Sequence, residues 1–184
     1  MQILKKIAFW RMIIVLLTGS ASLSAQTPVA VEYQLKAAFL FNFTKFVEWP
    51  ADVYSSDQDP FVIGILGGNP FGSFLEDVAA GEKVNGHPLV ISYFKNTNEI
   101  KRCQILFINK TGQYNVSDIL SDLKGKSVLT VGDTPDFLKL GGMVRFFINA
   151  SNKVQLQLNP DIAKTVRLQI SSKLLRLTEI YTQK

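Results

Sequence analysis

The chain has 184 residues, with 20 basic and 15 acidic side chains and a formal net charge of +5. Lys5, Lys6 and Arg11 lie in a predicted signal peptide, and without them 17 basic residues face 15 acidic ones, a net charge of +2. This balance gives no reason to expect nucleic acid or an anionic surface as a partner.

The first 25 residues have the pattern of a secretory signal peptide. Two lysines precede an apolar run over residues 7–17, and small residues follow as far as Ala25. A basic start, a short apolar run and a small-residue cleavage site are typical of such peptides, and the run is too short to span a bilayer comfortably. We predict cleavage after Ala25, with an uncleaved anchor as the alternative, and one domain over residues 26–184.

The segment from Val31 to Pro50 is the longest strongly patterned stretch that follows. A helical projection places Gln34, Thr44, Lys45 and Glu48 opposite one broad apolar face, which contains Leu35, Ala38, Phe39, Leu40, Phe43, Phe46 and Val47. This pattern predicts an amphipathic helix lying on the core. It ends at Trp49, because the proline that follows disfavours helical geometry there.

Two residues of this helix break the pattern. Asn42 lies in the middle of the apolar face, so its amide is either hydrogen-bonded within the core or has a specific role. Phe41 lies on the polar face. It is either buried under another element or part of a partner-binding surface, since aromatic residues are enriched at interfaces.

Strands and helices are predicted to alternate through the middle of the chain. The predicted strands cover residues 61–66, 89–94, 104–109 and 127–131, and the predicted helices cover 70–80, 98–101 and 114–123. Asn69 is predicted to cap the first of these helices, with Pro70 at its first position. Asn85 and Gly86 predict a turn before the second strand.

The last third of the chain predicts a brief helix that ends at Gly141-Gly142, then a hairpin and a closing helix. The hairpin strands are 143–150 and 153–158, and Asn159-Pro160-Asp161 begins a helix that runs towards Tyr181. That helix would carry two apolar stripes, so it is either sandwiched in the domain or used between subunits. Leu168 and Leu175, on the second stripe, are therefore candidate partner-binding residues.

Together these elements predict an α/β fold. Its mainly parallel, Rossmann-like sheet is flanked by helices and ends in an antiparallel C-terminal hairpin and a closing helix. Asn69, Asn109 and Asp133 each follow a predicted strand, and small ligands often bind at the carboxyl ends of parallel strands. These three residues define a candidate ligand pocket, although Asp133 also precedes a short helix that it would cap.

The sequence contains no recognisable catalytic pattern. The glycine-rich segment 64–72 does not match G-x-G-x-x-G or a P-loop, which favours a structural turn over a nucleotide site. Cys103 is the only cysteine, so it is either a buried small side chain or a partner in an intermolecular disulfide. The only histidine, His87, lies in a Gly-His-Pro turn. An enzyme is disfavoured, and no metal or cofactor is predicted.

Several segments resemble the YfiR family of exported bacterial proteins. The resemblance covers nearly the whole mature chain in order, through residues 33–50, 61–72, 84–89, 103–108, 127–133, 141–143 and 170–177. It implies a periplasmic α/β domain that lacks enzymatic activity and is often dimeric. It further implies a negative regulator that binds the periplasmic region of an inner-membrane diguanylate cyclase, lowering cyclic-di-GMP and biofilm formation.

One departure from the family pattern concerns regulation. The redox-sensing members carry several cysteines that form disulfides, whereas this chain has only Cys103. The partner implied by the resemblance is an inner-membrane signalling protein, either a diguanylate cyclase or a sensor kinase. A periplasmic small-ligand-binding protein, using the pocket near Asp133, is the alternative function.

Overall fold

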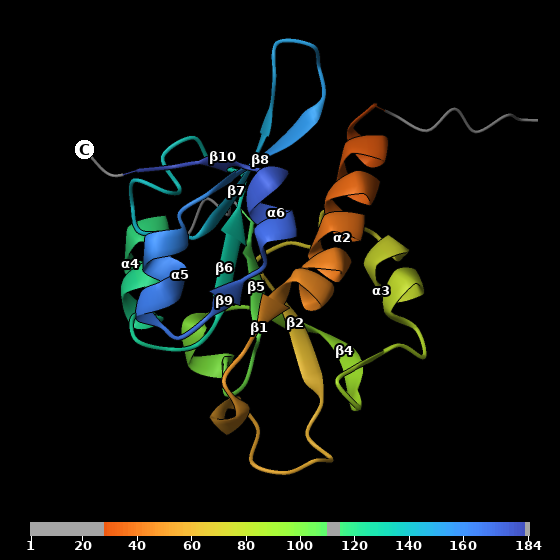
Figure 1. The fold of residues 1–184 in the computed structure, drawn as a ribbon. Coiled ribbons are helices and arrows are strands. Elements are labelled where there is room, and N and C mark those ends of the chain that lie inside the picture. The colour runs from red at the N-terminus through yellow and green to blue at the C-terminus, as the bar shows by residue number, and fades with distance from the viewer. Residues whose placement is uncertain (1–27, 110–114, 183–184) are drawn as a thin grey trace, which may run out of the picture.

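The structure is a computed structural model that describes residues 28–109 and 115–182 (Figure 1). The predicted signal peptide lies outside the described residues. Within them, no helix is long and apolar enough to cross a membrane.

An eight-stranded sheet forms the centre of the fold. Its strands are β2 (Phe61–Leu66), β3 (Lys83–Val84), β4 (His87–Phe94), β5 (Ile105–Ile108), β6 (Leu129–Gly132), β7 (Val144–Ile148), β8 (Val154–Leu158) and β10 (Glu179–Ile180). Their order across the sheet is β10-β8-β7-β6-β5-β2-β4-β3. The five strands from β7 to β4 are parallel, whereas β8 runs antiparallel to β7 and β3 to β4. The prediction of an α/β fold with a mainly parallel sheet is confirmed.

Helices cover both faces of the central strands, which explains why β2 is apolar along its whole length. Phe61, Ile63 and Ile65 pack into one core with helices α2 (Pro28–Phe46) and α3 (Phe74–Ala79). Val62 and Leu66 pack into a second core with α4 (Val116–Asp122). Alternate residues of a strand point to opposite faces, so an apolar run without alternation requires two covered faces. Figure 1 shows α2 and α3 together on one side and α4 on the other.

The long helix α2 differs from its prediction in its end and in its buried face. Its buried residues are Lys36, Ala37, Leu40, Phe43 and Thr44, whereas Leu35 is 44% exposed. The helix ends at Phe46, because β1 (Val47–Glu48) pairs antiparallel with β9 (Gln169–Ile170). The predicted end at Trp49 was wrong. The pairing of β1 with β9 ends the helix three residues earlier, at Phe46.

The predicted closing helix is wrong. The chain instead forms α5 (Pro160–Thr165), β9, α6 (Ser172–Arg176) and β10. The predicted start is confirmed, because the Asn159 side chain accepts a hydrogen bond from the Ile162 amide. The helix stops where Arg167 adopts a left-handed conformation with φ of 61°, and the Leu168 amide bonds back to the Ala163 carbonyl. This bond pattern is a helix C-terminal motif, so the two apolar stripes never form on one helix.

Other local predictions also changed. Helix α3 begins at Phe74, and Asn69 closes a turn instead of capping it: its Oδ1 accepts from the Phe71 amide and its Nδ2 donates to the Gly72 carbonyl. Residues 135–141 form turns, not a brief helix, and η2 (Thr97–Glu99) is a single 3-10 turn. The turn at Asn85 and Gly86 is confirmed by their φ angles of 51° and 92°. His87 begins β4 rather than lying in that turn.

Candidate functional site

The carboxyl ends of β2, β5 and β6 lie at one edge of the sheet, because these strands are adjacent and parallel. Asn69, Asn109 and Asp133 follow these three strands. Asn109 Nδ2 donates to the Gly68 carbonyl at 2.8 Å, and Asn69 Nδ2 donates to Tyr93 Oη at 3.2 Å. The asparagines therefore fasten neighbouring loops. Ligand binding at this edge stays a prediction.

Asp133 does not cap a helix, because its carboxylate is bonded to α2 instead. Its Oδ2 lies 2.8 Å from Lys36 Nζ and accepts a hydrogen bond from Tyr33 Oη at 3.0 Å. Lys36 Nζ also lies 2.7 Å from Glu32 Oε1, one helical turn earlier. We call these four residues, Glu32, Tyr33, Lys36 and Asp133, the α2 charge cluster.

The α2 charge cluster is buried at its centre. The Lys36 side chain is 3% exposed, and its ammonium group lies 4.3 Å from the centre of the Tyr33 ring. A buried ammonium group is costly unless charged or polar partners surround it, and here two carboxylates and an aromatic face do so. The cluster fixes α2 to the end of β6 and leaves its cation fully engaged within the protein.

Sequence reasoning missed Lys36, although a signal was present. Lys36, Leu40 and Phe43 are spaced i, i+4 and i+7, which places the lysine on the same helix face as two buried apolar side chains. The partner of this lysine, Asp133, lies 97 residues further along the chain. No local pattern connects the two.

Tyr33 makes the cluster sensitive to alkaline pH. Burial raises the pKa of its phenol well above the ordinary value, and the Asp133 carboxylate adds to this rise. Above about pH 10, the unfolded chain releases the phenolic proton while the folded chain keeps it, so stability falls as pH rises.

We therefore expect the free energy of unfolding to decline more steeply between about pH 9 and about pH 11 in the wild type than in Tyr33→Phe. Urea unfolding across this range measures the difference. Other titrating groups, including Tyr54, are shared by both proteins and cancel in the comparison. Equal slopes would show that the phenol has no raised pKa.

Cys103 is buried, as one of the two interpretations of its sequence expects. Its Sγ donates to the Ile105 carbonyl at 2.9 Å, and burial raises the pKa of the thiol to about 12. Disulfide exchange requires an accessible thiolate. The folded chain therefore holds its single cysteine in an unreactive form.

The three predicted partner-binding residues lie in different environments. Phe41 is half-buried, with Lys45 Nζ 4.5 Å from its ring centre. Leu168 is only 3% exposed and Leu175 packs partly against the core. The single helix that would carry Leu168 and Leu175 on one stripe does not form, and Leu168 is buried in the domain, which is one of the two alternatives for that stripe.

Phe41 lines a surface hollow of about 420 Å³ between the end of α2 and the β3–β4 turn. Trp49 contributes a second aromatic side chain, and Lys45, Glu48, Glu82 and Lys83 supply charges of both signs. We call this the Phe41 hollow. Aromatic residues are enriched at protein-binding surfaces, whereas lysine and glutamate are depleted at the centres of such surfaces.

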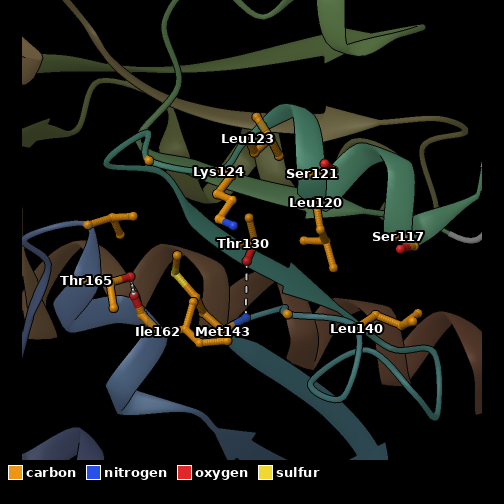
Figure 2. A pocket seen from close by; sticks show the side chains of 13 residues that line it. Ser117, Leu120, Ser121, Leu123, Lys124, Thr130, Leu140, Met143, Ile162 and Thr165 are labelled. Carbon is orange, nitrogen blue, oxygen red and sulfur yellow. Dashed lines mark hydrogen bonds between the residues drawn. The ribbon is translucent and has the colours of Figure 1, made fainter.

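A separate pocket of about 360 Å³ lies between α4 and α5 (Figure 2). Four segments form it: α4 and the turn after it, β6, the loop 140–143, and α5. Sequence reasoning missed it, because no single segment carries a recognisable pattern.

The structure is therefore an α/β domain in which the most buried charge, that of Lys36, pairs with Asp133 and holds α2 against the sheet. The chain matches the YfiR/HmsC-like family over residues 33–179, and it belongs to that family. This family is regulatory and non-catalytic, periplasmic, and connected with cyclic-di-GMP signalling. No curated protein gives a significant match to the chain.

Proposed function

We propose that this chain is a periplasmic regulator that binds the periplasmic region of an inner-membrane signalling protein. The partner is a diguanylate cyclase. By repressing this cyclase, the chain lowers cyclic-di-GMP and biofilm formation. The family match over residues 33–179 carries this proposal. The predicted signal peptide over residues 1–25 supports the compartment.

Repression follows from preferential binding. A regulator that binds the inactive state of a receptor more tightly than its active state increases the inactive population by that difference in affinity. The Phe41 hollow is the surface that we assign to the partner, because two aromatic side chains, Phe41 and Trp49, line it and aromatic residues are enriched at interfaces. Leu175, which packs on the core near the other end of the chain, is a weaker candidate.

Deletion of the gene that encodes this chain tests the function. We expect intracellular cyclic-di-GMP to rise, and we expect crosslinking in the periplasm to capture an inner-membrane protein with a cyclase output domain. Capture of a sensor kinase instead, with unchanged cyclic-di-GMP, would keep the regulatory class and reject the cyclase. If no membrane partner is captured and cyclic-di-GMP does not change, the proposal is rejected.

Phe41→Ala tests the assigned surface. We expect it to weaken partner binding at least about tenfold, because aromatic side chains at interface centres contribute most to affinity. The ring is half-buried, so the free energy of unfolding should fall by only about 1–2 kcal/mol, below the ~3–5 kcal/mol of a fully buried phenylalanine. Binding by pull-down and urea unfolding measure the two effects.

Leu177→Ala is the matched control, since Leu177 is a large apolar residue that is 65% exposed on another part of the surface. It should leave partner binding unchanged. If both variants bind equally well, the Phe41 hollow is not the partner surface, whereas a fall in stability of about 3 kcal/mol or more would place Phe41 in the core.

A further inference from the structure

The pocket between α4 and α5 carries one positive charge, on the exposed side chain of Lys124. Lys124 is the only charged residue among the described residues that line it, and its side chain points into the pocket towards Thr130 (Figure 2). Among the residues that the structure describes, Lys124 forms no ion pair. A lone cation at the edge of a pocket favours an anionic ligand.

A buried hydroxyl group lies at the same end of the pocket. Thr130 is 3% exposed, and its Oγ1 accepts a hydrogen bond from the Met143 amide at 3.1 Å. The acceptor role is thus filled, and the hydroxyl hydrogen has no acceptor among the described residues. Thr165 differs, because its hydroxyl already donates to the Ile162 carbonyl at 2.7 Å.

The remaining walls are largely apolar. Leu120, Met143, Ile162 and Val166 face the space, and none of the lining residues in the described part of the chain is acidic. A volume of about 360 Å³ is within the range of small-molecule pockets. The pocket therefore offers an ammonium group and a hydroxyl donor beside an apolar trough.

We infer that this pocket binds an amphipathic monocarboxylate. Lys124 and Thr130 hold the carboxylate, and the apolar body of the ligand lies against Leu120, Met143 and Ile162. A charge-assisted bond to lysine and a hydroxyl donor match the two oxygens of a carboxylate. This site shares no residue with the Phe41 hollow, and its ligand does not depend on the membrane partner.

Calorimetric titration of the chain without its first 25 residues tests the inference. The probes are octanoate and phenylacetate, which share the carboxylate and differ in the apolar body, with octanol and octylamine as uncharged and cationic comparisons. We expect at least one carboxylate to bind, and to bind more tightly than octanol and octylamine. The tighter carboxylate identifies the body as a chain or a ring.

Lys124→Gln should weaken carboxylate binding about tenfold, because it removes one charge-assisted hydrogen bond. Lys126→Gln is the matched control, because Lys126 is exposed, lies two residues away and does not line the pocket. It should bind like the wild type. Equal weakening by both variants would indicate nonspecific attraction and overturn the assignment.

Ile162→Phe, which fills the trough, should also abolish binding. In the wild type, the carboxylate should shift the amide NMR signals of Leu120, Thr130 and Ile162. This mapping does not depend on the folding of any variant. No binding by either carboxylate, equal binding of octanol, or signal shifts confined to other parts of the chain would each overturn the inference.

Discussion

Asp133→Asn should destabilise the protein by about 3 kcal/mol. This substitution keeps the shape of the side chain but removes the negative charge that lies 2.8 Å from Lys36 Nζ. Lys36 is 3% exposed, so its ammonium group cannot turn to water to replace the lost partner. Removing one member of a buried pair typically costs ~3–5 kcal/mol, and the remaining Glu32 carboxylate keeps the loss near the lower limit.

Asp52→Asn is the matched control for this measurement. Asp52 also pairs with a cation, Arg167, at 2.8 Å, but the two side chains are 60% and 62% exposed. Solvent screening makes such a pair worth less than about 1 kcal/mol. Urea unfolding of both variants compares the same substitution in buried and exposed pairs, and equal losses would show that the α2 charge cluster is not a buried pair.

A double-mutant cycle with Lys36→Met separates the pair from its surroundings. Without the lysine, Asp133→Asn should cost much less than in the wild type, because no buried cation is left unpaired. Since the cluster joins α2 to the end of β6, its loss should also loosen the N-terminal part of that helix. Hydrogen exchange of the α2 amides measures this local effect.

Gly142→Ala should destabilise the protein by about 3 kcal/mol or more. An added Cβ would lie 2.2 Å from Cε1 of Phe137, a ring that is completely buried. The ring has little room to move away, because Gly132 lies so close to its other side that an atom at the Cβ position of Gly132 would be 2.6 Å from the ring. Forcing additional atoms into a filled core typically costs ~1–3 kcal/mol, and here both sides of the ring are confined.

Gly68→Ala is the control, because the nearest atom to its added Cβ is 3.7 Å away and its φ angle is not left-handed. Its effect on thermal unfolding should be small. In a Phe137→Leu background, Gly142→Ala should cost much less, since the smaller side chain leaves room for the methyl group. Equal effects of Gly142→Ala in both backgrounds would rule out the steric explanation.

Local features of the sequence predicted much of the fold. The apolar runs at residues 61–66 and 104–109 indicated buried strands, and parallel pairing of β2 with β5 agrees with that prediction. Asn159 capped a helix and Asn85 with Gly86 formed a turn, as predicted. These features depend on the conformational preferences of a few neighbouring residues, so a short stretch of chain contains the necessary information.

The closing helix shows where local reasoning failed. The apolar residues between Ile162 and Ile180 fit a helical period, but the chain turns at Arg167 and brings Gln169 and Ile170 beside β1. Burial of Leu168 and Leu174 in the core determines their positions more strongly than helical periodicity. Leu168, one of the candidate partner-binding residues from that projection, is therefore buried in the core.

By itself the sequence determined the α/β class and the family, and it located Phe41 as an exception on its helix. Only the tertiary structure decided that Lys36 is buried against Asp133, that Leu168 is in the core, and that Lys124 faces a pocket between α4 and α5. The physical reason is the range of the interactions involved. Caps, turns and strand runs are governed by adjacent residues, whereas a buried ion pair or a pocket exists only when distant segments pack together.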